Sequence, residues 1–471
     1  MSAPAREGSL VRAVGTWALA ASIVNITVGG GIFRLPSDPG VSGVLGAAAP
    51  LAYLVCAVAM GLIVICFAEA GSRVSLTGGP YAYVERAFGP FAGWMSGVLL
   101  WVLGTTAVAA VSTVFADNLV RLVPALDSRG AKAALIAGAF AVTAAINIRG
   151  VRQGARLNTV VTIAKLAPLL LLVAAGAFAL VPENLAWQEA PGAGDVSRAS
   201  VVLIFAFAGI ESALVPSGEV RDPARTVPRA IFIAMTGVTL LYIAVHLVAL
   251  GVLGPALTGS ATPLADAAGV ALGPWGSRLL ALGVVVSTFG YLGGMTLAIP
   301  RALFAFARDG FLPRPLADVH ARWHTPYVAI VVQAVLAVML AVTSGFARLA
   351  LLSNVAVLLL YLGCCLAAWE LRRRDVREGG IPFRVPGAVV APALAAVVIL
   401  YLLASVTWRE WAVVIGVLVA ATALFAATAG RRARLAAEAA EGAAGARPAA
   451  REPEAAAERR GTPPDIEAAT D

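Results

Sequence analysis

The sequence predicts an all-α polytopic membrane protein with about twelve transmembrane helices. Of its 471 residues, 59% are hydrophobic and only 13% are charged, whereas soluble domains carry roughly 25% charged residues. The mean hydropathy is +0.85, and the apolar residues gather in runs of about the 20 residues that cross a bilayer core of ~30 Å. Because lipid offers no partner to a backbone amide, these long runs predict helices and not the short alternating segments of a β-barrel.

The apolar runs divide the chain into two sets of five spans, followed by two more. We expect a cytoplasmic N-terminus (1–12), a first repeat (13–181), a second repeat (199–369), helices 11 and 12 (388–429) and a disordered cytoplasmic tail (430–471). The predicted spans are 13–36, 43–68, 91–119, 132–148, 157–181, 199–218, 228–253, 276–300, 327–343, 348–369, 388–406 and 410–429.

The distribution of positive charge predicts the orientation. Most of the 35 lysine and arginine residues fall on the side of the spans that the two chain ends share. The positive-inside rule therefore predicts the cytoplasmic (inner) membrane with both termini in the cytoplasm. Because the net charge of +8 is scattered over short loops and the tail, we expect no nucleic acid partner. The cysteines lie in apolar runs and no metal-ligand spacing occurs, so we expect neither a metal nor another cofactor.

The first span contains three consecutive glycines, Gly29, Gly30 and Gly31. Each glycine costs about 1 kcal/mol relative to alanine in a helix interior. Close packing of two helices is the alternative explanation, but a small-residue packing face would space such residues about four apart. We therefore favour an unwound segment in the middle of the first helix.

The sixth span contains a matching stretch from Phe205 to Gly209, followed by the carboxylate of Glu211. Helices 1 and 6 hold corresponding places if helices 1–5 and 6–10 form two inverted repeats. Paired interruptions of this kind indicate the midplane site of a transporter. Freed amides at a half-helix start attract a carboxylate and freed carbonyls accept from an ammonium group, so we expect a zwitterionic substrate.

Four stretches, taken together, resemble the amino acid–polyamine–organocation (APC) superfamily. They are Gly29–Phe33 with Leu35-Pro36, Ala68–Arg73 leading to Gly78–Tyr83 and Phe88–Pro90, Phe205–Glu211 followed by Gly218-Glu219, and Arg301–Gly310. The resemblance covers about residues 12–430. It implies a 5+5 inverted-repeat core with discontinuous helices 1 and 6, two additional C-terminal helices, and transport by alternating access.

The resemblance also implies substrate contacts in the two interruptions. The amides of Gly30 and Gly31 would hold the substrate carboxylate, and the carbonyls of Thr27, Phe205 and Ala208 would hold its amino group. The ring of Phe205 would close the site as a gate. The implied substrate-binding set is Thr27, Gly29, Gly30, Gly31, Phe205, Ala206, Ala208 and Gly209.

Lys165 is a charge inside the fifth predicted span, where insertion costs at least ~2.5–3.5 kcal/mol. One interpretation is that its side chain extends to the cytoplasmic surface. In sodium-coupled relatives of the implied fold a sodium ion occupies this place, and in some proton-coupled APC members a lysine replaces it. We hypothesise that Lys165 replaces sodium and carries a coupling proton, which burial makes easier to release, with Ser287 and Thr288 as candidate partners. Glu211 either caps freed amides or takes part in gating or protonation.

The predicted function is a proton-coupled permease for neutral amino acids, because the predicted pocket is apolar or neutral apart from Glu211. An amino acid or polyamine exchanger is the alternative. A membrane-embedded enzyme is a distant alternative, since the sequence contains no catalytic constellation, and we expect no enzymatic activity. His246, in the seventh span, is expected to be a packing or interface histidine with its hydrogen bonds satisfied. The expected partners are an amino acid, protons and the lipid bilayer.

Overall fold

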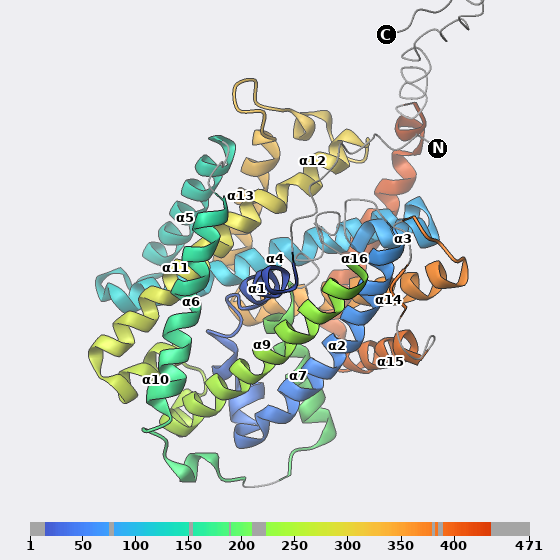
Figure 1. Cartoon of the computed structure of the whole chain (residues 1–471). Helices are drawn as coiled ribbons and strands as arrows, with labels where there is room; N and C mark the ends of the chain where they lie inside the picture. The colour runs from blue at the N-terminus through green and yellow to red at the C-terminus, as the bar shows by residue number, and fades with distance from the viewer. Residues whose placement is uncertain are drawn as a thin grey trace, which may run out of the picture.

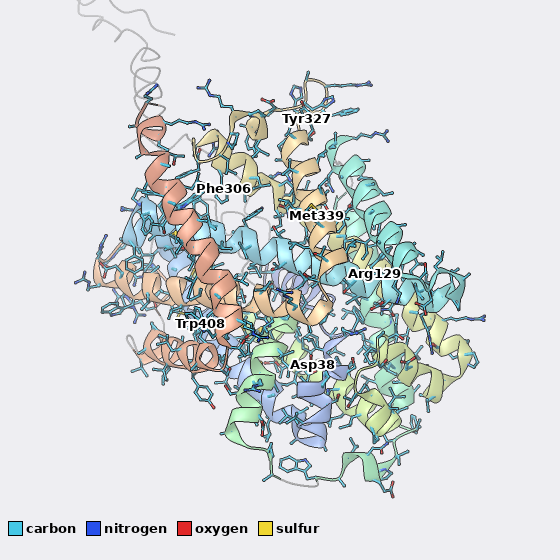
Figure 2. All side chains as sticks on the ribbon, turned by 180° about the vertical axis from the view of Figure 1, so that it is seen from behind. Asp38, Arg129, Phe306, Tyr327, Met339 and Trp408 are labelled. Atoms are coloured by element: carbon cyan, nitrogen blue, oxygen red, sulfur yellow. The ribbon has the colours of Figure 1, made fainter. Side chains whose placement is uncertain are left out.

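The structure is a computed structural model that describes residues 15–74, 80–149, 154–187, 190–209, 223–378, 382–384 and 390–434. In these ranges the regular elements are helices, and none is a strand. The helices pack side by side (Figure 1), and the side chains between them (Figure 2) include one large hydrophobic core. The all-α prediction is therefore confirmed for the described part of the chain.

Fifteen described α-helices make up the fold. They are α1 (Thr16–Thr27), α2 (Ala49–Arg73), α3 (Pro80–Phe88), α4 (Pro90–Leu122), α5 (Arg129–Arg149), α6 (Gly154–Gly176), α7 (Ala193–Phe207), α9 (Pro223–Leu253), α10 (Pro263–Leu272), α11 (Pro274–Ala298), α12 (Pro300–Arg308), α13 (Tyr327–Thr343), α14 (Phe346–Arg373), α15 (Val390–Ala404) and α16 (Trp408–Ala427). The shorter 3₁₀ and π turns are η1 (Leu35–Ser37), η2 (Pro39–Gly43), η3 (Gly46–Ala48), η4 (Pro124–Leu126), η5 (Pro182–Leu185), η7 (Gly254–Leu257) and η8 (Arg314–Ala317).

Seven stretches of the described chain are long and apolar enough to cross a membrane. They are Gly46–Arg73, Pro90–Leu122, Arg129–Arg149, Arg229–Leu257, Pro274–Arg308, Phe346–Arg373 and Trp408–Ala427. Each range predicted from the sequence overlaps one of the α-helices. The number of helices that cross the bilayer, and the inverted symmetry of the two sets of five, stay predictions.

Proline and glycine set the starts of two of the long helices. Gly89 precedes Pro90 with a φ of 89°, and Gly273 precedes Pro274 with a φ of 74°. Both φ values lie in the region that glycine adopts without strain. Proline suits the first helical position because its fixed φ fits the helix and its missing N–H would have no partner there. The chain therefore turns sharply at the glycine and enters the next helix at the proline.

Helix α4 lies at the centre of the molecule, where it packs against α11 and α14. It is the most buried of the seven candidate spans, with 78% of its most apolar window inside the protein. Helix α9 packs between α1 and α2 (Figure 1). Helix α7 packs against both α2 and α14. The two helices with predicted interruptions, α1 and α7, are thus held by different neighbours.

A buried ion cluster joins the C-terminal ends of α2 and α14. The carboxylate of Glu69 accepts from the Nη2 of Arg73 at 3.0 Å and from the Nη2 of Arg372 at 2.6 Å. The side chains of Glu69 and Arg73 are each 1% exposed. Two guanidinium groups therefore share one carboxylate away from solvent, and the cluster fixes this end of α14 to α2.

Candidate functional site

Helix α1 stops at Thr27, where the glycines begin. The amide of Val28 donates the last helical bond, to the carbonyl of Val24 at 2.9 Å, and the chain bends through Gly31. The amide of Leu35 then donates to the carbonyl of Gly31 at 2.8 Å. The structure thus has an unwound segment at the glycines. The continuation differs from the expected half-helix, because η1 and η2 are short 3₁₀ and π turns.

Helix α7 stops in the corresponding way at Phe207. The amide of Ala208 donates to the carbonyl of Ile204 at 2.9 Å, while the ψ of Ala208, 152°, is already extended. Gly209 follows with a φ of 115°, in the region that favours glycine. The helix of the sixth predicted span therefore ends at the expected place, and its continuation beyond Gly209 lies outside the described residues. Glu211 lies outside the described residues, so its predicted role stays a prediction.

The two interrupted segments lie against each other. A Cβ added to Gly31 would lie 2.9 Å from the Cα of Ala206 and 3.1 Å from the Cδ1 of Phe205. A Cβ added to Gly30 would lie 2.7 Å from the nearest side-chain carbon of Val111 in α4. Gly31 therefore lets the backbone of the first segment approach the backbone of the second, and Gly30 lets it approach α4.

Tyr242 of α9 connects the ends of the two interrupted helices. Its hydroxyl oxygen lies 2.9 Å from the carbonyl oxygen of Thr27 and 2.8 Å from that of Ala206. The hydroxyl has one proton to donate, so the two carbonyls share it. The side chain is 0% exposed. Nothing in the sequence marks Tyr242 for this role, although a buried tyrosine needs a partner for its hydroxyl.

Lys165 of α6 reaches the first interruption. Its side chain is buried, and its Nζ donates to the carbonyl oxygen of Val28 at 2.9 Å. The structure therefore places this ammonium group at the end of α1. Ser287 and Thr288 are buried on α11, which packs against α6. The hydroxyl of Thr288 donates to the carbonyl of Val284 at 2.7 Å. The partnership of Ser287 and Thr288 with Lys165 stays a prediction.

Phe205 lies beside the first residue of α14. Its ring centroid is 5.6 Å from that of Phe346, and the two rings are nearly perpendicular at 85°. Phe205 is 8% exposed, so the pair forms a buried aromatic contact between α7 and α14. The gating role of Phe205 stays a prediction.

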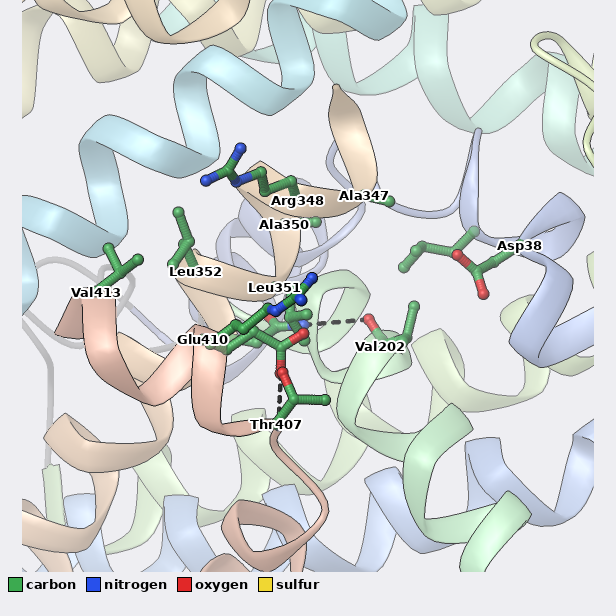
Figure 3. A pocket seen from close by; sticks show the side chains of 13 residues that line it. Asp38, Val202, Ala347, Arg348, Ala350, Leu351, Leu352, Thr407, Glu410 and Val413 are labelled. Carbon is green, nitrogen blue, oxygen red and sulfur yellow. Dashed lines mark hydrogen bonds between the residues drawn. The ribbon is translucent and has the colours of Figure 1, made fainter. Parts of the chain in front are cut away.

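A cavity of about 480 Å³ lies between α7, the first turns of α14 and the start of α16 (Figure 3). The Nδ2 of Asn354, which lines it, donates to the carbonyl of Val201 at 2.7 Å. Asp38, Arg348 and Glu410 also line this cavity. Its lining includes none of the residues 28–31 or 205–209. Asn354 therefore holds α14 to α7 close to Phe205, outside the unwound segments.

Two further polar side chains bear on the predictions. The hydroxyl of Thr27 is buried and has no hydrogen-bond partner among the described residues. His246 is fully buried against the ring of Tyr53, at 5.5 Å. The expectation that His246 packs in the interior is confirmed, and its hydrogen bonding stays a prediction.

The comparisons with known proteins agree with this architecture. Residues 14–429 match the family model described as amino acid permease. The chain is 26% identical over 434 residues to the methylthioribose transporter of Bacillus subtilis, covering 88% of this chain and 94% of that protein. It is 27% identical over 429 residues to the branched-chain amino acid permease BcaP of the same organism, covering 87% and 91%. It is 29% identical over 330 residues to the serine/threonine exchanger SteT, also of Bacillus subtilis, covering 67% and 73%. The chain is therefore a multi-pass membrane protein that belongs to the amino acid permease family.

Proposed function

We propose that this chain is a secondary active transporter that moves amino acids across the cytoplasmic membrane by alternating access. The observation that supports this best is the pair of adjacent helix ends at Thr27 and Phe207. Inside a membrane, backbone groups that leave a helix need other partners. A zwitterionic amino acid supplies partners for both kinds of backbone group, since its carboxylate accepts from amides and its ammonium group donates to carbonyls. The proposed substrate-binding residues are those expected from the sequence, Thr27, Gly29–Gly31, Phe205, Ala206, Ala208 and Gly209.

The proposed substrates are neutral amino acids. The described residues of the two interruptions have apolar or uncharged side chains. The names of two relatives, a branched-chain amino acid permease and a serine/threonine exchanger, support neutral amino acids as the substrates. The name of a third relative, a methylthioribose transporter, supplies an alternative substrate that is not an amino acid.

The proposed coupling ion is a proton carried by Lys165. As an ammonium group, Lys165 donates to the carbonyl of Val28 at 2.9 Å. Loss of the proton would weaken this bond, because hydrogen bonds from charged donors are about twice as strong as neutral ones. Protonation of Lys165 would thus favour the geometry of α1 in this structure. We propose Glu211 as a second group in gating or protonation.

The proposed topology has twelve transmembrane helices, a 5+5 inverted-repeat core and both termini in the cytoplasm. It is supported by the excess of lysine and arginine on one side of the predicted spans. Under this topology, α1 and α9 each start at the cytoplasmic side. The Glu69 cluster lies on the same side. Phe205 and the cavity near Asn354 then lie toward the outside.

Counterflow into proteoliposomes tests the proposal. We expect unlabelled neutral amino acids inside the vesicles to drive uptake of the same labelled amino acid. Cationic amino acids, a polyamine and methylthioribose, tested in parallel, should drive none. If only methylthioribose is transported, the amino acid assignment is wrong. If no compound in the panel is transported, the transport proposal itself loses its support.

An amino acid exchanger is the second candidate, favoured by the similarity to SteT. Vesicles without internal substrate separate the two modes. Proton symport predicts uptake into these vesicles when the outside is more acidic than the inside. An exchanger predicts uptake only when the vesicles contain an amino acid, whatever the pH gradient.

A further inference from the structure

A groove runs along the outer surface of the molecule between α2 and α9. Its volume is about 590 Å³, and its walls include Leu54, Phe232 and Leu240. These side chains are 49%, 73% and 63% exposed, and both helices contain stretches that can span a membrane. On α2 the floor is formed by Ala57 and Gly61. An added Cβ at Gly61 would meet nothing within 4 Å, so the groove is open at this point.

A second hollow, of about 500 Å³, continues the groove toward the start of α9. Phe232 lines both hollows, and the second is also lined by Thr16 and Trp17 of α1 and by Arg229. Arg229 is exposed, and the indole of Trp17 is 75% exposed. Tryptophan and arginine at the end of an apolar surface are typical of the membrane–water interface. The groove and this second hollow together form an apolar surface channel, which ends at the positive charge of Arg229.

The length of the channel matches one leaflet. From Arg229 to Leu240 there are eleven residues of α9, or about 16 Å at 1.5 Å per residue. This is about half of a hydrocarbon core of ~30 Å. Under the proposed topology the arginine end lies at the cytoplasmic leaflet, where anionic lipids attract basic side chains.

We propose that this channel binds an anionic phospholipid of the cytoplasmic leaflet. The headgroup phosphate lies at Arg229, and one acyl chain lies along Phe232 and over Gly61. The hollow at Arg229 is walled partly by α1, and α1 packs against α9 and ends at the unwound glycines. A lipid in the channel therefore stabilises the packing of α1 on α9, next to the interruption.

Lipid binding to the purified full chain tests this proposal without reference to transport. The probes are dioleoylphosphatidylglycerol, dioleoylphosphatidylcholine and inorganic phosphate, each added to protein in detergent. Binding is measured by native mass spectrometry and by the melting temperature. We expect phosphatidylglycerol to bind and to raise the melting temperature more than phosphatidylcholine, and phosphate to have no effect. Equal effects of the two lipids, or stabilisation by phosphate alone, would overturn the proposal.

Two variants with matched controls locate the site. Arg229→Gln should weaken phosphatidylglycerol binding about fivefold, the equivalent of the roughly 1 kcal/mol that one basic residue contributes at an anionic membrane surface. Arg198→Gln, which changes an exposed arginine on α7, should not weaken it. Gly61→Leu should fill the groove and reduce binding, whereas Gly416→Leu, at another open glycine, should not. Equal losses in a variant and its control, or unchanged binding in both Arg229→Gln and Gly61→Leu, would show that the lipid does not bind here.

Discussion

The ammonium nitrogen of Lys165 lies 2.9 Å from the carbonyl oxygen of Val28. In a continuous helix this carbonyl would accept a bond from the amide four residues later. Because the chain bends at the glycines, the carbonyl needs another donor, and a buried lysine from α6 supplies it. The end of α1 is thus hydrogen-bonded to the group that we propose carries the coupling proton.

Replacing this donor should impair transport. In Lys165→Met the carbonyl of Val28 loses a charged donor, and a buried polar group without its partner costs about 1–3 kcal/mol. We expect the initial rate of amino acid uptake into proteoliposomes to fall at least about fivefold. The remaining uptake should no longer respond to a pH gradient.

Lys132→Met provides the control for the lysine prediction. The Lys132 side chain is 36% exposed and pairs with Asp117 and Asp127. This variant should keep both the uptake rate and its response to pH. Undiminished, pH-dependent uptake by Lys165→Met would contradict the coupling role.

Removing the hydroxyl of Tyr242 should loosen both interruptions together. Tyr242→Phe keeps the ring and leaves the carbonyls of Thr27 and Ala206 without the donor they share. A lost hydrogen bond of this kind contributes about 0.5–1.5 kcal/mol. We expect apparent substrate affinity to weaken by about two- to thirteenfold, measured as the concentration dependence of uptake.

Tyr401→Phe is the matched control, because the exposed Tyr401 donates to one carbonyl, that of Ala193, at 3.3 Å. Its apparent affinity should equal that of the wild type. If the two variants behave alike, Tyr242 has no special part in joining the two helices.

The sequence predicted the interruptions but not the contacts that hold them. Three adjacent glycines disfavour a helix through their own backbone freedom, which is a local property. Lys165 was found because a charge in an apolar span is conspicuous. Tyr242 was missed because its acceptors lie 215 and 36 residues away in the sequence, and nothing local marks them. The turns η1 and η2 were missed for a related reason, since packing against distant segments shapes the chain after the glycines.

The two close-packed glycines of the first interruption should differ in their tolerance of alanine. In Gly31→Ala the new methyl group would lie 2.9 Å from the backbone of Ala206, which cannot move without shifting α7. In Gly30→Ala the methyl would meet the two γ-carbons of Val111 at 2.7 and 2.8 Å, and a small shift of this side chain relieves the contact more easily than a shift of the α7 backbone. We expect Gly31→Ala to abolish substrate-dependent thermal stabilisation and Gly30→Ala to reduce it.

Gly138→Ala in α5 is the control for both glycine variants. A Cβ at this position meets nothing within 4 Å, and alanine favours a helix by about 1 kcal/mol over glycine. Its thermal stability should equal or exceed that of the wild type. A ranking in which Gly30→Ala is more harmful than Gly31→Ala would contradict the proposed approach of the two backbones.

Among the charged groups that the structure describes, we expect the cluster at Glu69 to contribute most to the stability of the protein. Glu69→Gln keeps the shape of the side chain and removes the negative charge that Arg73 and Arg372 share. Breaking a buried ion pair by removing one partner typically costs about 3–5 kcal/mol, because the remaining charge is left uncompensated. We expect a correspondingly large fall in the melting temperature of the purified protein.

The same reasoning predicts a partial rescue. In the double variant Glu69→Gln with Arg372→Gln, one positive charge leaves together with the negative one, and the remaining charge equals that of the original cluster. The double variant should therefore be more stable than Glu69→Gln alone. Asp309→Asn, which breaks the exposed pair with Arg308, should change stability by no more than about 1 kcal/mol. A double variant less stable than Glu69→Gln would contradict this prediction. It would show that shape and hydrogen bonding stabilise this end of α14 and that the balance of charge does not.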